Sequence, residues 1–188
     1  MISQERWCIE QHSKTNHFYS EYLPYEFHLR MVCQVYEDYK YLLDDDFDYY
    51  SGNRIYPFDI NKKISLRRAC YLACWGHDLI EDTRTSYNDV KDKLGQEVAE
   101  IIYAVTNEKG KNRKERANHK YYEGIRNTKG AVFVKLCDRI ANVQYSKMTK
   151  SRMFEMYQKE NQHFIEELGW YETHEYKVMF DYLQNLFK

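Results

Sequence analysis

Ligand-type side chains stand in three segments whose other residues are mostly apolar. His28 and His77 each share a predicted helix face with aliphatic residues, and Asp138 lies within the apolar segment 131–145. A carboxylate buried without a partner is costly, so Asp138 must be paired, protonated or bound to a metal ion. A single histidine on an apolar face is usually an ordinary core residue, so only the three positions together indicate a functional site.

The segment from residue 77 to residue 82 concentrates such side chains. If it is helical, His77, Asp78, Glu81 and Asp82 project into an arc of about 140°. A solvated acidic helix end is the alternative interpretation, but the neighbouring apolar residues argue against full exposure. We therefore expect this segment to supply ligands or proton carriers from one face.

A second predicted helix carries Lys135, Asp138 and Asn142 on one face, because they are three and four residues apart. Two histidines and two aspartates suit a hard or borderline divalent cation such as Mn²⁺, Fe²⁺ or Zn²⁺. Two cysteines one helical turn apart, Cys70 and Cys74, offer an alternative zinc set with the nearby histidine. Their apolar helix face favours ordinary packing instead.

Hydrophobic periodicity predicts only helices to position these residues. No segment shows the sustained alternation of a strand, and 2 prolines and 7 glycines leave few forced turns. The expected helices cover residues 26–43, 65–82, 85–94, 98–105, 131–145, 153–168 and 176–187. The sequence thus predicts one all-α domain over residues 1–188, with an acidic loop at 44–48 and a basic loop at 109–120.

Composition argues against several classes of function. The 28 basic and 29 acidic residues give a net charge of −1, so a nucleic-acid polymer is not an expected partner. No run approaches the roughly 20 apolar residues that span a bilayer, and the first residues lack the apolar core of a signal peptide. Five cysteines without a Cys-x-x-Cys pair are typical of a reducing compartment, so we expect a cytoplasmic protein that binds no membrane.

The order of the ligand-type residues resembles that of the HD-domain metal-dependent phosphohydrolases. Residues 77–83, HDLIEDT, resemble the HD-x-x-EDT segment of the RelA/SpoT hydrolase domain. Residues 135–142, KLCDRIAN, resemble its K-L-A-D-R-x-x-N helix, and residues 24–28, PYEFH, resemble its PY-x-x-H segment. The resemblance spans about residues 22–145, with a compatible helical extension at 151–188. In extent the chain is similar to the stand-alone hydrolases, including the metazoan SpoT homologues.

The resemblance implies a single HD-type helical bundle around a central metal site. It places four residues as the metal ligands: His28, His77, Asp78 and Asp138. Mn²⁺ is the usual ion of the family, with Fe²⁺, Mg²⁺ or Zn²⁺ as other candidates. Glu81 and Asp82 match the acidic pair that orients or deprotonates the attacking water, and Asn142 matches a substrate contact. The implied reaction is removal of the 3′-pyrophosphate of (p)ppGpp by a metal-activated water.

Two departures from the family pattern concern the substrate. Aligned on PYEFH without gaps, Tyr19 and Ser20 stand where the family usually carries an Arg-Lys pair, and Gln144 stands where an arginine is common. A tyrosine can stack on a base but cannot pair with phosphate, so we expect Tyr19 to contact the nucleotide base. Lys135, Arg139 or the basic loop would then supply positive charge to the phosphates.

Other functions stay open at this point. The substrate can be another phosphorylated nucleotide such as NADPH, or the chain can be a metal-holding module that senses a nucleotide without turnover. The acidic pair at positions 81 and 82 favours catalysis, since a sensor does not need it. The amphipathic C-terminal helices also allow a homodimer.

Overall fold

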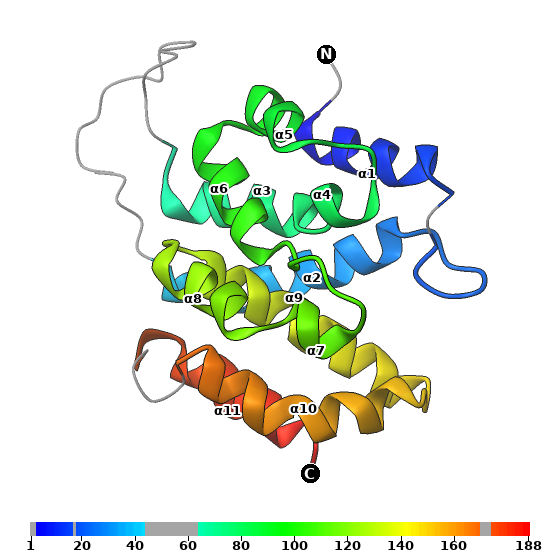
Figure 1. Ribbon diagram of the computed structural model, residues 1–188, viewed down its shortest axis with the longest axis vertical. Coiled ribbons are helices and arrows are strands. Elements are labelled where there is room, and N and C mark those ends of the chain that lie inside the picture. The colour runs from blue at the N-terminus through cyan, green and yellow to red at the C-terminus, as the bar shows by residue number, and fades with distance from the viewer. Residues whose placement is uncertain (1–2, 17, 44–63, 170–173) are drawn as a thin grey trace.

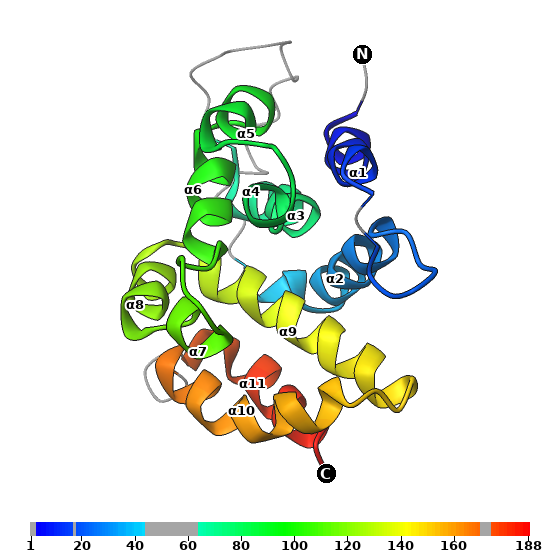
Figure 2. The same ribbon diagram turned by 45° about the vertical axis from the view of Figure 1, so that its right-hand side comes forward.

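The long helix α9 (Ala131–Met148) runs through the middle of the computed structural model, and the other helices surround it (Figures 1 and 2). Its first turns are apolar on nearly every side, so its neighbours bury it all round. The structure describes residues 3–16, 18–43, 64–169 and 174–188. Within these ranges the regular elements are helices, and an isolated bridge joins Phe18 to Pro24.

The other helices vary from one turn to four turns in length. Their bounds are α1 Gln4–Lys14, α2 Glu26–Tyr39, α3 Leu66–Gly76, α4 Leu79–Asp82, α5 Tyr87–Leu94, α6 Gln96–Val105, α7 Arg113–Arg116, α8 His119–Asn127, α10 Met153–Glu167 and α11 Lys177–Asn185. Short 3₁₀ turns lie at Lys40–Leu42 and His174–Tyr176.

Helices from both halves of the chain pack on α9. Helices α2, α3 and α6 cover it from one side, and α10 and α11 cover it from the opposite side (Figure 2). Helix α8 also contacts α9, while α1 packs on α3 and α4, and α5 packs on α6. Because α9 contacts both groups, a side chain on α9 can meet residues that are far from it in the sequence.

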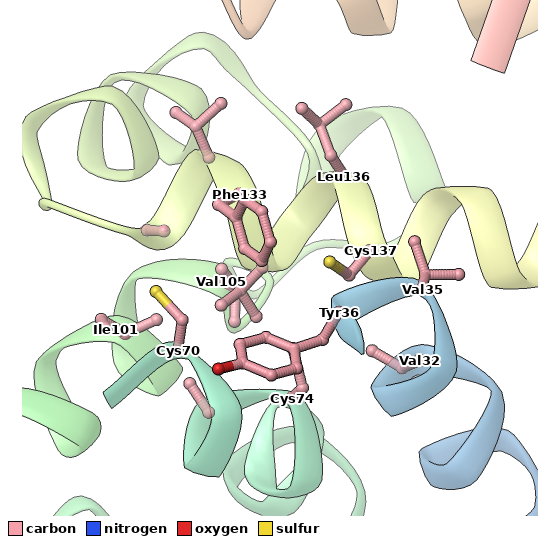
Figure 3. Packing of buried hydrophobic residues seen from close by; sticks show 14 of the residues in the cluster. Val32, Val35, Tyr36, Cys70, Cys74, Ile101, Val105, Phe133, Leu136 and Cys137 are labelled. Atoms are coloured by element: carbon pink, nitrogen blue, oxygen red, sulfur yellow. The ribbon is translucent and has the colours of Figure 1, made fainter. Parts of the chain in front are cut away.

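Figure 3 shows the core where α2, α3 and α9 meet. Phe133 of α9 points toward the ring of Tyr36 of α2, whose hydroxyl is directed at α3, and the two ring centroids lie 6.1 Å apart in an edge-to-face arrangement. Cys70 and Cys74 of α3 and Cys137 of α9 fill the surrounding space as free, buried thiols. The packing interpretation of Cys70 and Cys74 is therefore confirmed.

The all-α prediction is confirmed for the described residues, and most expected helix boundaries agree within a few residues. The expected continuous helix over 65–82 is wrong. Helix α3 ends at Gly76 and α4 begins at Leu79, so His77 and Asp78 lie at a junction. The two side chains reach the same point, since His77 Nε2 lies 2.9 Å from Asp78 Oδ2.

The basic stretch 109–120 also differs from its prediction as a loop. It contains the single-turn helix α7 and the beginning of α8. Each helix is capped by an asparagine side chain, since Asn112 accepts from the backbone N–H of Glu115 and Asn118 accepts from that of Tyr121. The hydrophobic pattern misses α7 because this helix buries no residue, and it misses α8 because its few buried residues come directly after a run of charged residues.

Helix α1 is not among the expected helices either. Its buried residues are Cys8 and His12, which make too weak an apolar stripe to stand out. The expected acidic loop 44–48 lies outside the described residues. In the described ranges, no helix combines the length and the apolar character needed to cross a membrane.

Gly130 precedes α9 in a backbone conformation that other residues avoid. Its φ of +87° is left-handed, and a Cβ there would lie 2.7 Å from Cys70 Sγ. We expect Gly130→Ala to lower the free energy of unfolding by about 1–3 kcal/mol, from strain and overpacking. Gly124→Ala, in α8 where a Cβ meets nothing within 4 Å, should raise it by about 0.5–1 kcal/mol. Urea denaturation measures the free energy of unfolding of both variants. Equal values for Gly130→Ala and Gly124→Ala would contradict the close contact at Gly130.

Candidate metal centre

Four side chains from three helical segments meet at one buried point. His28 comes from the first turn of α2, His77 and Asp78 from the α3–α4 junction, and Asp138 from the middle of α9. The ligand atoms of His28, His77 and Asp78 all lie within 4.8 Å of one another. The two histidines are 1% and 2% exposed, and Asp138 is 9% exposed. The structure thus brings the four predicted ligand residues together.

The spacing of the donor atoms suits one divalent ion. His28 Nε2 lies 3.2 Å from His77 Nε2, 3.7 Å from Asp78 Oδ2 and 3.4 Å from Asp138 Oδ1. His77 Nε2 lies 2.9 Å from Asp78 Oδ2 and 3.6 Å from Asp138 Oδ1. Metal–ligand bonds of about 2.1 Å place neighbouring ligands roughly 3.0–3.4 Å apart. Two imidazoles and two carboxylates at these distances therefore fit a cation of the Mn²⁺, Fe²⁺ or Zn²⁺ type.

The chain before the junction sets the orientation of His77. Its Nδ1 lies 3.0 Å from the carbonyl oxygen of Cys74 in the last turn of α3. A carbonyl oxygen only accepts, so Nδ1 carries a proton and Nε2 is the nitrogen directed at the other three ligand residues. A metal ion would bind His77 through Nε2, in place of a proton.

Charges within the cluster keep both carboxylates ionised. Burial would raise the pKa of Asp78, but the adjacent His77 holds it well below its usual range. Burial also opposes the ionised form of Asp138, yet Lys135, whose Nζ lies 3.1 Å from Asp138 Oδ2, holds that pKa well below its usual range. Burial disfavours a charged His77, whereas Asp78 and Asp138 raise its pKa well above 6.5. A strongly negative pair of carboxylates is the electrostatic setting that attracts a cation.

Tyr25 is a site residue that the sequence analysis did not assign. Its hydroxyl donates a hydrogen bond to Asp78 Oδ2 and lies 3.4 Å from Asp82 Oδ2. Its ring stacks on His12 of α1, with the centroids 4.3 Å apart. Tyr25 therefore links α1 to one of the ligand carboxylates. Its place in the PYEFH segment, three residues before His28, is the sequence signal that points to it.

The two predicted catalytic acids lie beside the ligand cluster in different surroundings. Glu81 is half-buried, and Asn107 donates to it from Nδ2, at 2.8 Å and 3.0 Å to the two carboxylate oxygens, and from its backbone N–H at 3.2 Å. Asp82 is more exposed, but partial burial and the negative charges of Asp78 and Glu81 raise its pKa to about 7. One carboxylate is fixed in direction, and the other is close to its midpoint of ionisation at neutral pH.

A cavity of about 540 Å³ lies beside the cluster. The ligand residues His28, Asp78 and Asp138 contribute to its lining, together with Glu81 and Asp82. The rest of the lining is largely cationic or aromatic and comes from α7, α8, α9 and α10: Arg113, Lys114, Arg116, Tyr121, Tyr122, Lys135, Arg139, Tyr157, Lys159 and Phe164. We call these residues the cationic wall. The basic stretch and the C-terminal extension are therefore parts of the site.

Arg139, a predicted substrate residue, is buried in the cationic wall. Its guanidinium carbon lies 4.1 Å from the ring centroid of Phe164 and 4.8 Å from that of Tyr157. Glu160 of α10 accepts from Arg139 at 3.4 Å and from Arg113 Nε at 2.8 Å. Figures 1 and 2 both show α7 close to α10, as this shared carboxylate requires. One acidic side chain thus holds cations from α7 and α9 beside the cavity.

The remaining predicted substrate residues lie against the ligand cluster. The ring of Tyr19 is parallel to that of His28 with the centroids 4.6 Å apart, and its hydroxyl donates to Asn142 Oδ1 at 2.8 Å. Asn142 lines the cavity; Tyr19 is not among the described residues that line it. Gln144 donates to the hydroxyl of Tyr182 on α11 at 2.9 Å. One face of the Tyr19 ring is thus in contact with His28, and the expected contact with a base stays a prediction.

Comparison with solved structures identifies the arrangement of helices. A structure described as a metazoan ortholog of SpoT, which hydrolyses ppGpp and plays a role in starvation responses, matches with a TM-score of 0.64. The match covers 98% of this chain and 96% of that chain, at 16% sequence identity. The chain has the SpoT-type fold. The predicted HD-type helical bundle is therefore confirmed.

Sequence comparison gives a shorter match to a SpoT-type hydrolase. The guanosine-3′,5′-bis(diphosphate) 3′-pyrophosphohydrolase MESH1 of Drosophila melanogaster is 29% identical to this chain over 68 residues. These residues are 36% of this chain and only 38% of the MESH1 protein. No protein-family model matches the chain. The resemblance to SpoT-type hydrolases thus stands on the fold over nearly the whole chain and on sequence over about a third of it.

Proposed function

We propose that this chain is a metal-dependent phosphohydrolase that removes the 3′-pyrophosphate of (p)ppGpp, giving GDP or GTP and pyrophosphate. The observation that carries the proposal is the convergence of two histidines and two aspartates beside a cavity with a cationic wall, in a SpoT-type fold. Both similar proteins are named for the hydrolysis of ppGpp or of its 3′-pyrophosphate, which supports this substrate.

The proposed chemistry divides between the ligand cluster and the acidic pair. His28, His77, Asp78 and Asp138 would hold a divalent ion, which when bound lowers the pKa of water and neutralises charge on phosphoryl oxygens. Glu81 and Asp82 together orient the attacking water and take its proton, and the Asp82 pKa of about 7 suits a general base. Asn107 supports this role by fixing the direction of the Glu81 carboxylate.

The cationic wall supports an anionic nucleotide as the substrate. The cavity that it lines has a volume of about 540 Å³, within the range of small-molecule sites, roughly 300–1,000 Å³. Arg113, Lys114 and Arg116 of α7 can form charge-assisted hydrogen bonds with phosphate groups, and the aromatic residues of α8 and α10 offer surfaces for a base. Lys135 adds positive charge next to the ligand cluster.

A substrate panel tests the proposal. Mn²⁺-loaded protein incubated with ppGpp should release pyrophosphate and leave GDP, which ion-exchange chromatography separates. EDTA should stop the reaction, because the ligand cluster then lacks its ion. NADPH and a 3′-monophosphorylated nucleotide belong in the same panel. Preference for NADPH would contradict the proposed substrate, and no phosphate or pyrophosphate release from any compound would contradict the hydrolase itself.

We further propose that the resident ion is Mn²⁺, that the compartment is the cytoplasm and that residues 1–188 form one HD domain. The mixed nitrogen and oxygen ligand set supports Mn²⁺, and five free, buried cysteines support a reducing compartment. The helical extension packs on α9 and lines the cavity, which supports a single domain. The C-terminal helices α10 and α11 pack on α9 within the chain, so their amphipathic pattern does not require a second copy. The homodimer stays a prediction.

A further inference from the structure

The two ligand histidines are oriented by different means. A metal-binding imidazole usually donates its second N–H to a carboxylate or a carbonyl group, which fixes the ring. His77 follows this pattern through the carbonyl oxygen of Cys74, 3.0 Å from its Nδ1. The buried Nδ1 of His28 has no hydrogen-bond partner among the described residues. Apart from the ligand-side contacts of its Nε2, His28 is therefore oriented by ring packing.

Two tyrosines provide that packing. The ring of Tyr19 is parallel to that of His28, with the centroids 4.6 Å apart and an interplanar angle of 9°. Tyr25 meets the same imidazole edge-on, at 5.3 Å and 68°. Tyr19 is itself fixed, because its backbone N–H donates to Leu23 O at 2.9 Å and its ring contacts that of Tyr145 at 4.8 Å. His28 is thus enclosed by two aromatic rings whose positions are set by other contacts.

The hydroxyl of Tyr19 reaches a second ligand through Asn142. Tyr19 donates to Asn142 Oδ1 at 2.8 Å, and Asn142 Nδ2 donates to Asp138 Oδ1 at 2.6 Å and to Asp138 O at 3.1 Å. Both Asp138 oxygens only accept, so the amide must present Nδ2 to them and Oδ1 to Tyr19. With the amide in this orientation, the Tyr19 hydroxyl is the donor to Asn142 Oδ1. A continuous path of contacts therefore runs from Tyr19 to Asp138.

We infer that Tyr19 is a positioning residue of the metal centre, which holds His28 through its ring and Asp138 through Asn142. The inference rests on the proposed metal site and replaces the expected contact between Tyr19 and a nucleotide base. It leaves phosphate recognition to the cationic wall, because Tyr19 carries no positive charge. Groups that orient metal ligands act on metal affinity, and a base contact does not.

Mn²⁺ affinity distinguishes a Tyr19 that positions metal ligands from a Tyr19 that contacts the nucleotide base. Tyr19→Leu removes the ring stack and the hydroxyl, and it should weaken Mn²⁺ binding about ten- to hundredfold. Tyr19→Phe keeps the ring and should weaken binding less than Tyr19→Leu does. Tyr22→Leu is the matched control, since Tyr22 lies in the same loop and is 84% exposed, and it should bind Mn²⁺ as the wild type does. The electron paramagnetic resonance signal of free Mn²⁺ measures all three affinities.

The outcomes distinguish this inference from the proposed function. Wild-type Mn²⁺ affinity in Tyr19→Leu, with a raised KM for ppGpp, would overturn the inference and restore the base contact. Tyr19→Phe tests the hydroxyl path without disturbing the ring, so a folding defect in the leucine variant does not remove the test. Unchanged Mn²⁺ binding in His77→Ala would overturn the metal site itself, on which the inference rests.

Discussion

Asp138→Ala should abolish both divalent-metal binding and hydrolysis. The carboxylate supplies one of four converging ligand atoms, 3.4 Å and 3.6 Å from the two imidazole Nε2 atoms. It also pairs with the Lys135 ammonium at 3.1 Å, so its removal leaves a positive charge where a cation should bind. Metal-assisted charge stabilisation contributes several kcal/mol, and each ~1.4 kcal/mol changes the rate tenfold. We therefore expect turnover to fall by at least about a thousandfold.

Binding, turnover and folding of the Asp138 variants need separate measurements. Mn²⁺ titration reports binding, pyrophosphate release from ppGpp reports turnover, and circular dichroism of the metal-free protein reports folding. Asp38→Ala is the matched control, because Asp38 is exposed on α2, and it should resemble the wild type in all three. Asp138→Asn keeps the side-chain volume and covers the case in which the alanine variant misfolds. Near-wild-type Mn²⁺ affinity in both Asp138 variants would show that this carboxylate is not a ligand.

The ligand positions can be predicted from the sequence because they conflict with their surroundings. A carboxylate in the apolar helix at 131–145 and histidines on apolar faces need a reason to be there, and a shared metal ion supplies one. The spatial arrangement of these ligand residues cannot be predicted from the sequence in the same way. Helical periodicity predicts a continuous helix through His77 and Asp78, whereas in the structure α3 ends before them and α4 begins after them.

The cationic wall shows a second limit of sequence reasoning. Arg113 and Glu160 are 47 positions apart, and no local pattern indicates that one holds the other beside the cavity. The basic stretch is predicted as a loop because hydrophobic periodicity fails there, although two asparagine caps begin α7 and α8 within it. Tyr19 illustrates the same point for a single residue. Its chemistry allows stacking, but only the packed structure shows that the partner is His28.

Glu81→Gln should leave metal binding intact and lower kcat by about 10²–10⁴-fold, the usual contribution of a positioned proton-transfer group. Glu81 is not one of the converging ligands, and its carboxylate is held by Asn107 at 2.8 Å and 3.0 Å. Glutamine keeps the shape of the side chain but lacks the negative charge that orients water and accepts its proton. The substitution therefore separates the acidic pair from the metal ligands.

Glu97→Gln is the matched control for the Glu81 variant, because Glu97 is an exposed residue in the first turn of α6. It should keep the wild-type kcat and the wild-type Mn²⁺ affinity. Single-turnover measurement with saturating ppGpp isolates the chemical step from product release. If Glu81→Gln keeps the wild-type kcat, the acidic pair does not work as proposed, and Asp82 with its pKa of about 7 becomes the group that takes the proton. If Glu81→Gln instead loses Mn²⁺, Glu81 belongs to the ligand set, and the division between ligands and acidic pair is wrong.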